Sequence, residues 1–154
     1  MEGAFAQDRS QRAAQTEVSI FVDSSFWFAT VVARDEHNPR ARAILREVDG
    51  FVTTDHVIVE TWLLLNSRYK RVRAERFWNR FRQGAVEVEM VTMSDMHAAW
   101  AIGDAFPDQA FSIVDRTSFA VMERLGLTRV ASFDTDFAVY RYGRDRNRAF
   151  EILR

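Results

Sequence analysis

Four carboxylates that directly follow short apolar runs are the residues of this sequence best suited to chemistry. They are Asp23, Glu60, Asp115 and Asp134, with Asp136 two positions after the last. Short apolar runs form buried segments, where an unpaired negative charge is costly. Acids that recur at the ends of such segments therefore indicate a ligand that needs negative charge. A divalent cation is the simplest ligand of this kind.

The donor atoms narrow the choice of cation. The chain has no cysteine, and its three histidines, His37, His56 and His97, are not beside the acids in the sequence. Carboxylates about 4 Å apart repel by on the order of 4 kcal/mol at an effective dielectric of 20, and a hard cation removes this repulsion. Oxygen ligands alone favour Mg²⁺ or Mn²⁺ over zinc or copper. Such sites promote in-line hydrolysis of a phosphodiester.

The elements that must position these acids alternate between strand and helix. Strands are predicted at residues 18–22, 51–54, 85–91, 129–132 and 150–153. Helices are predicted at residues 24–31, 39–48, 56–68, 71–83, 95–105 and 112–125. This alternation predicts an α/β fold whose central sheet is mostly parallel and flanked by helices. The alternating residues 85–91 predict a half-buried strand near a sheet edge.

Parallel strands end at the same edge of a sheet, and ligands of α/β proteins bind there. Asp23 follows the first strand and Asp134 follows the fourth. Glu60 lies about one turn into the helix after the second strand, and Asp115 lies near the start of the helix before the fourth. We therefore expect the four acids to converge, although an acid at a helix start can also be an ordinary cap.

Polar residues at the predicted helix starts suggest how these helices begin. Ser24 or Ser25 is a candidate N-cap of the first helix, and Asp55 is a candidate for the helix that carries Glu60. Ser94 or Asp95 is the candidate for the helix that ends near residue 105. Ser24 and Ser132 are also candidates for contacts with the metal site, and Arg116 is a candidate for contact with a substrate phosphate.

Bulk properties point to one domain at residues 18–154, preceded by a flexible extension at residues 1–17. The chain has 154 residues and a net charge of −1, so no global field favours nucleic acid or membrane. Its apolar runs are far shorter than the roughly 20 residues of a membrane span. The absence of cysteine fits a reducing compartment, and we expect a cytoplasmic protein.

Four segments in order resemble the motifs of PIN-domain nucleases. Residues 20–25 resemble the opening strand and first acid, and residues 53–60 resemble the second strand and the helix-borne glutamate. Residues 111–119 and 130–137 resemble the segments that carry the third and the last acids. The order and spacing match over residues 18–154. Within the family, the VapC-type toxins of toxin–antitoxin pairs are the most similar group.

This resemblance implies a Mg²⁺- or Mn²⁺-dependent endoribonuclease that is usually dimeric and is inhibited by a cognate VapB-type antitoxin. It implies that Asp23, Glu60, Asp115 and Asp134 are the metal-binding acids. Members differ in which acid of the last motif coordinates, so Asp136 is the alternative to Asp134.

Two other functional classes share features of this sequence. Receiver and haloacid-dehalogenase-type domains also place an aspartate at a strand end with Mg²⁺, but they need a lysine after a late strand, and the only lysine here is Lys70 in a basic segment. A PIN-like binding module without catalysis is the second alternative, and the intact set of acids argues against it. The basic segment itself is either a solvated helix face or a surface for RNA phosphates or an acidic antitoxin segment.

Overall fold

A five-stranded sheet forms the centre of the computed structural model, which describes residues 19–84 and 86–154. The predicted extension at residues 1–17 lies outside the described residues. The strands are β1 Ile20–Val22, β2 Phe51–Thr54, β3 Glu87–Glu89, β4 Arg129–Ala131 and β5 Glu151–Leu153. Their order is β3-β2-β1-β4-β5, and all four neighbouring pairs are parallel. The α/β fold with a parallel sheet is therefore confirmed, as is the position of β3 at an edge.

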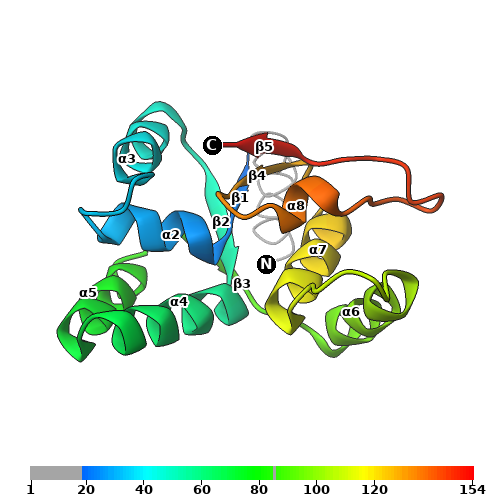
Figure 1. The fold of residues 1–154 in the computed structure, drawn as a ribbon, viewed down its shortest axis with the longest axis horizontal. Coiled ribbons are helices and arrows are strands. Elements are labelled where there is room, and N and C mark those ends of the chain that lie inside the picture. Colours follow the sequence, from blue (N-terminus) through cyan, green and yellow to red (C-terminus); the bar gives the residue numbers. More distant parts are fainter. Residues whose placement is uncertain (1–18, 85) are drawn as a thin grey trace, which may run out of the picture.

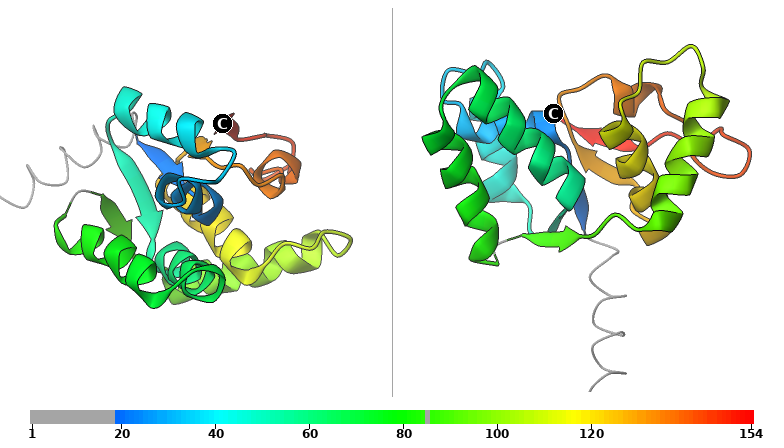
Figure 2. Two further views of the ribbon diagram at one scale, coloured as in Figure 1. Left: turned by 60° about the vertical axis from the view of Figure 1, so that its left-hand side comes forward. Right: turned by 90° about the horizontal axis from the view of Figure 1, so that it is seen from below.

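Helices cover both sides of this sheet. They are α2 Ser24–Val31, α3 Asn38–Glu47, α4 Asp55–Arg68, α5 Arg71–Arg82, α6 Met93–Ala105, α7 Ile113–Leu125 and the short α8 Asp136–Val139. Helices α2 to α5 lie on one side, and α6, α7 and α8 lie on the other (Figures 1 and 2). Within the described part of the chain, no helix has the length and apolar character needed to cross a membrane.

The strand order places a topological switch point between β1 and β4. The chain runs from β1 outward through β2 to β3, then crosses back to β4 on the other side of β1. Because consecutive connections leave β1 and β4 in opposite directions, the carboxyl ends of these two strands are where an α/β protein is expected to bind a ligand. The backbone N–H of Asp23 donates to the carbonyl of Ala131 at 3.1 Å. The ends of β1 and β4 are thus held side by side.

An aromatic core fastens α7 and the C-terminal segment to the sheet. Phe119 of α7 and Tyr140 are both fully buried, and their rings stack with centroids 4.1 Å apart. Phe137 of α8 meets Phe119 edge-on at 5.0 Å and lies 6.4 Å from Phe21 of β1. These large side chains bury the most apolar area per residue in such cores. The packing fixes the position of α8, whose first residue is Asp136.

The predicted elements are confirmed, but the predicted helix caps are wrong. Thr54 caps α4 by accepting from the N–H of Val57, and Thr92 caps α6 by accepting from the N–H of Asp95. Asp55 is already helical, and its carboxylate instead accepts from the N–H of Val91 at 2.9 Å. This contact joins segments far apart in the sequence. Local preference for a cap therefore yields to a long-range hydrogen bond.

The start of α2 also differs from the expectation. Asp23 occupies the N-cap position without a side-chain capping bond, and Ser24 is the first helical residue. The hydroxyls of Ser24 and Ser25 both donate to the carboxylate of Asp23, at 3.4 and 2.8 Å. These two serines therefore serve the acid and not the helix terminus.

Candidate metal centre

Three aspartates from the C-terminal half of the chain form a compact cluster. Asp115 comes from the first turn of α7, Asp134 from the loop after β4, and Asp136 from the first position of α8. One carboxylate oxygen from each lies within 4.8 Å of the others. This separation suits oxygen ligands that share one cation. The structure thus brings Asp134 and Asp136 together, and both remain candidates for direct coordination.

Asp23 lies beside this cluster and is held rigidly. Its side chain is buried, with 2% of its surface exposed. One carboxylate oxygen accepts from the hydroxyls of Ser25 at 2.8 Å and Ser132 at 2.9 Å. The same serines accept from the backbone of the loop after β4, because Phe133 N–H donates to Ser25 and Asp134 N–H donates to Ser132. Asp23 is thereby oriented by the loop that carries Asp134.

Glu60 is the acid that α4 contributes to this region. It is half-buried on α4 and is electrostatically coupled to Asp23, Asp115 and Asp134. The Ser24 hydroxyl, which donates to Asp23, also lies near Glu60 and acts to lower its pKa. Acids from β1, α4, α7 and the loop after β4 therefore share one region of negative charge. The structure thus brings the four predicted acids within range of electrostatic interaction, although only Asp115 and Asp134 of the four belong to the compact cluster with Asp136.

Asp115 has a capping role as well as a place in the cluster. Its carboxylate accepts from the N–H of Ser112 at 2.8 Å, and the Ser112 hydroxyl accepts from the N–H of Asp115 at 3.0 Å. This reciprocal pair is a capping box, which the spacing of Ser112 and Asp115 in the sequence could have revealed. Asp136 is the acidic neighbour of this carboxylate and acts to raise its pKa. The helix terminus thus orients a carboxylate that faces the other acids.

Burial and crowding make the metal-free site unfavourable for negative charge. Burial and the neighbouring Asp136 together raise the pKa of Asp115 to about 6, against the hydrogen bonds from Ser112, which lower it. Burial also raises the pKa values of Asp23, Glu60 and Asp136, and Coulombic repulsion between the acids adds to each increase. These carboxylates carry no arginine or lysine partner among the described residues. A cation would supply the missing positive charge.

The remaining predicted contacts lie around the cluster in different ways. Ser132 and Ser24 contact Asp23 as described above. Arg116 extends toward α6, where its guanidinium lies over Gly103 and occupies the space that a larger side chain there would need. Its Nε donates to the carbonyl of Ser112 at 3.4 Å. Its contact with substrate stays a prediction.

Two features near the acids were not foreseen from the sequence. The first is Ser25, which links Asp23 to the loop after β4. The second is His37, whose ring stacks on Phe133 with centroids 4.3 Å apart, next in sequence to Asp134. Sequence separation hid both contacts, since Ser25 and Ser132 lie 107 positions apart. The run of two serines after Asp23 is the only local signal for the first.

We expect Ser25→Ala to weaken divalent-cation binding about 10-fold and to lower the free energy of unfolding by about 1 to 2 kcal/mol. The Ser25 hydroxyl orients Asp23 and also accepts from the N–H of Phe133, which would lose its partner. Calorimetric titration with Mn²⁺ and urea unfolding measure the two effects. Ser67→Ala is the control, because the exposed Ser67 bonds only to a carbonyl of its own helix. Equal Mn²⁺ affinity in both variants would contradict this role for Ser25.

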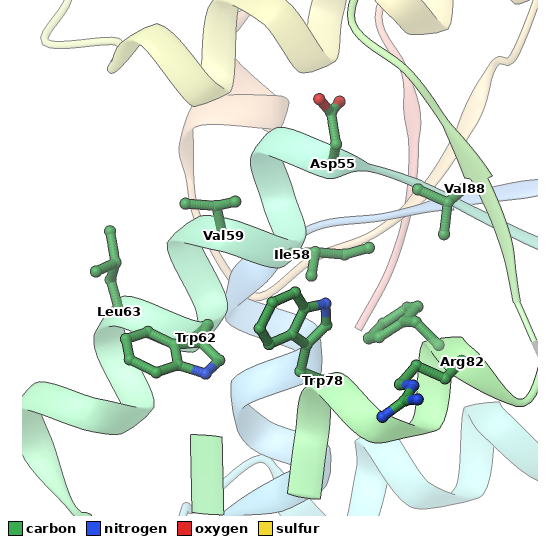
Figure 3. Close-up of a pocket in the computed structure, with 9 residues that line it drawn as sticks. Asp55, Ile58, Val59, Trp62, Leu63, Trp78, Arg82 and Val88 are labelled. Carbon is green, nitrogen blue, oxygen red and sulfur yellow. The ribbon is translucent and has the colours of Figure 1, made fainter. Parts of the chain in front are cut away.

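A separate apolar pocket lies between α4, α5 and β3 and has a volume of about 610 Å³. Trp62 and Trp78 project into it, and Asp55 and Arg82 stand at its margins (Figure 3). The pocket is lined by a stripe of α4 that includes Ile58 but not Glu60. Since Glu60 lies on another face of α4, the pocket is not part of the acidic site.

Comparison with known proteins agrees with this geometry. The model of the PIN domain matches residues 20–142, a range that includes Asp23, Glu60 and the three clustered aspartates. This chain belongs to the PIN-domain family. The 23S rRNA-specific endonuclease VapC20 of Mycobacterium tuberculosis is 37% identical over 120 residues, which cover 77% of this chain and 92% of VapC20. Family membership and this relative support nuclease activity.

Solved structures of PIN-domain proteins share the fold. The crystal structure of M. tuberculosis VapC20, described as a sarcin–ricin-loop-cleaving toxin, superposes with a TM-score of 0.75 at 35% identity, covering 78% of this chain and 93% of that one. A toxin–antitoxin complex from Klebsiella pneumoniae gives a TM-score of 0.58 at 12% identity over 77% of this chain and 90% of that one. The structure of FitAcB from Neisseria gonorrhoeae gives a TM-score of 0.62 at 15% identity, covering 88% of this chain and 96% of that one. The latter two show the fold alone.

Proposed function

We propose that this PIN-domain protein is a Mg²⁺- or Mn²⁺-dependent endoribonuclease of the VapC type. The observation that carries the proposal is the convergence of Asp115, Asp134 and Asp136 within 4.8 Å, with Asp23 and Glu60 electrostatically coupled to the same cluster. A nuclease site of this composition needs no histidine base. The 37% identity to a ribosomal RNA endonuclease supports the choice of RNA as the substrate.

The residues of the site fit a hard divalent cation. All the donors are carboxylate oxygens, and burial raises the pKa values of Asp23, Glu60, Asp115 and Asp136. Crowded carboxylates without cationic partners repel one another. A bound cation removes this repulsion, which favours its binding over binding to isolated carboxylates. We assign Asp23, Asp115, Asp134 and Asp136 as its ligands and place Glu60 at the margin of the site.

When bound, Mg²⁺ or Mn²⁺ supplies positive charge for displacement at phosphorus and lowers the pKa of water. The chain contributes position and charge. Asp23 is oriented by Ser25 and Ser132, and Asp115 is oriented by the N-terminus of α7. In this proposal Glu60, whose pKa is raised by burial, would take the proton of the attacking water as the new oxygen–phosphorus bond forms. The bond to the leaving oxygen then breaks, and this oxygen takes up a proton from solvent.

The substrate and partners follow from the relatives. We propose that the target is the large ribosomal RNA, as in the name of VapC20, and that the cleaved bond lies in its sarcin–ricin loop. The protein then acts in the cytoplasm, where this RNA is found. We further propose a homodimer that is neutralised by a cognate VapB-type antitoxin. The toxin–antitoxin complex among the structural neighbours is consistent with such a partner.

Cleavage of purified ribosomal RNA tests the proposal. We expect antitoxin-free protein to cut 23S rRNA at one position with Mg²⁺ or Mn²⁺, to lose all cleavage with EDTA, and to recover it when excess metal is added. Mapping of the RNA ends by primer extension locates the bond. Intact RNA at every metal concentration would contradict the proposal, and cleavage that persists in EDTA would contradict the metal centre.

The same preparation discriminates the alternatives. A phosphoryl-handling domain needs a lysine near Asp23, but Lys70 lies at the junction of α4 and α5, beyond the far end of the helix that carries Glu60. A phosphoryl-handling domain would be recognised by phosphorylation of Asp23 with acetyl phosphate. A silent binding module would show neither cleavage nor binding of Mn²⁺ by calorimetry.

A further inference from the structure

A stripe of arginines on α5 lies outside both the acidic site and the apolar pocket. Residues 61–86 contain seven of the 21 lysines and arginines of the chain and a single acid, Glu75. Three of these bases, Arg73, Arg76 and Arg80, have the spacing i, i+3 and i+7 and therefore form one row along the helix. All three are exposed. We call this row the α5 stripe.

The α5 stripe is not neutralised within the protein. Glu75 pairs with Arg71 at 3.5 Å, on another face of the helix. Within residues 19–84 and 86–154, no carboxylate forms an ion pair with the three arginines of the stripe. The guanidinium of Arg73 lies over the ring of Tyr69, at 4.9 Å from its centroid. The stripe thus presents free positive charge to solvent.

The other arginine-rich segment, at residues 141–148, contrasts with the stripe. Arg141 donates to the carbonyls of Ala138 and Tyr140, and Arg146 donates to the Tyr140 hydroxyl at 2.6 Å. Those arginines hold the C-terminal segment in place. Since they are used by the fold, a high arginine content alone does not define a binding surface, whereas unpaired and aligned arginines do.

The α5 stripe is connected to the acidic site by two rows of residues. On α4, Glu60 and Arg68 share one face and are eight residues apart, or about 12 Å along the axis. On α2, Ser24 at the acidic site and Phe28 also share one face. The rows meet where the Arg68 guanidinium lies 5.5 Å from the Phe28 ring centroid. Tyr69, which contacts both Phe28 and Arg73, continues this surface to the stripe.

We infer that Arg68 and the α5 stripe form an arginine track that binds the phosphate backbone of structured RNA on one side of the cleaved bond. This inference rests on the proposed ribonuclease function and extends it to the flanking RNA. A guanidinium binds phosphate oxygens through two parallel hydrogen bonds, which favours arginine over lysine for this task. Structured RNA is recognised largely through its shape and backbone. The track can therefore hold RNA whose sequence varies at these positions.

A protein segment is the less suitable occupant. The apolar pocket that could hold an amphipathic segment lies on the side of α5 that carries Trp78, Phe81 and Arg82. Helical geometry turns Arg73, Arg76 and Arg80 away from these three residues. A segment seated in the pocket would not reach the stripe.

The test is the variant Arg73→Gln/Arg76→Gln/Arg80→Gln, built in the Asp23→Asn background for RNA binding and in the active protein for cleavage. Glutamine retains helix propensity close to that of arginine. The binding probe is an RNA hairpin with the sarcin–ricin loop sequence. We expect its Kd to rise about 30-fold at about 0.15 M salt, and the slope of log Kd against log salt to fall by about 2, since each phosphate contact adds about 0.7. Cleavage of a single-stranded substrate of a few nucleotides stays unchanged.

The matched control removes the same charge elsewhere, in Arg42→Gln/Arg46→Gln/Arg144→Gln. These three arginines are exposed and lie on α3 and in the loop near the C-terminus. Equal hairpin affinity and equal salt slope in both variants would overturn the track. Unchanged hairpin binding with weakened binding of the antitoxin would overturn it in favour of a protein interface. If the parent protein cuts neither substrate, the proposed ribonuclease function is refuted. If the parent protein cuts RNA and the triple variant of the α5 stripe binds the hairpin as the parent does, only the arginine track is refuted.

Discussion

Asp23→Asn is expected to lower the rate of RNA cleavage by about 1,000-fold while the fold is retained, because a buried anionic ligand becomes neutral. The asparagine carbonyl oxygen can still accept hydrogen bonds from Ser25 and Ser132, so the ends of β1 and β4 remain connected. Burial raises the pKa of the Asp23 carboxyl, and removal of this charge relieves repulsion in the metal-free protein. Single-turnover cleavage of 23S rRNA and circular dichroism measure the two outcomes.

Asp35→Asn is the matched control for this loss of activity. Asp35 lies in the turn after α2 and accepts from the N–H of His37. We expect its substitution to leave the cleavage rate within about 2-fold of the parent, because substitutions outside special environments have small effects. Cleavage by Asp23→Asn at the parental rate would refute the site assignment. Loss of the circular dichroism signal would show that Asp23 supports the fold.

Two helices begin with capping boxes whose aspartates have pKa values shifted in opposite directions. Thr92 and Asp95 form the box of α6, and Ser112 and Asp115 form the box of α7. Asp95 is 2% exposed and binds Arg124 through both oxygens, at 2.8 and 3.0 Å. Burial acts to raise the pKa of Asp95, but the hydrogen bonds from Arg124 and Thr92 and the charge of Arg124 together hold it below its usual range. Burial raises the pKa of Asp115 to about 6. The same local motif therefore has a paired and an unpaired carboxylate.

We expect Asp95→Asn to lower the free energy of unfolding at pH 7 by about 2 to 3 kcal/mol, because Arg124 loses a buried ionic partner. Asp115→Asn in metal-free protein is expected to raise it by about 1 to 2 kcal/mol. A shift of the Asp115 pKa from 3.8 to about 6 corresponds to at most about 3 kcal/mol. An amide oxygen binds the Ser112 N–H less strongly than a carboxylate, which reduces the gain. Urea unfolding in EDTA measures both values.

The dependence of stability on pH tests independently whether each carboxylate stabilises or destabilises the fold at pH 7. A carboxyl group whose pKa is higher in the folded than in the unfolded protein stabilises the fold fully when the pH is below its pKa in the unfolded protein. This stability is lost as the pH rises through its pKa in the folded protein. Metal-free protein should therefore lose stability between about pH 4 and pH 6 through Asp115, and Asp115→Asn should remove that loss. The stability that Asp95 contributes is present above its unfolded pKa and is lost as the pH falls through its lowered value. Destabilisation by both substitutions at pH 7 would contradict the crowding of charge at Asp115.

Local sequence patterns were sufficient for the strands and for the acids that the structure brings close to one another. Apolar runs bounded by polar residues predicted β1, β2 and β4, and the acids after them were placed at the carboxyl ends of parallel strands. The same patterns failed at the starts of α4 and α6, where Thr54 and Thr92 cap the helices. A cap depends on one hydrogen bond among several local donors and acceptors. Contacts such as that of Asp55 with the N–H of Val91 decide between them.

The sequence by itself determined which carboxylates follow buried segments, because hydrophobic periodicity is a property of neighbouring residues. Only the tertiary structure decided how these carboxylates are held and balanced. The register that pairs Val22 with Ala131 brings Ser25 to Ser132 across 107 positions and thereby orients Asp23. The loop after β4 and the packing of α8 bring Asp134 and Asp136, respectively, to Asp115. Register and packing depend on the whole core, and for this reason no single segment of the sequence encodes them.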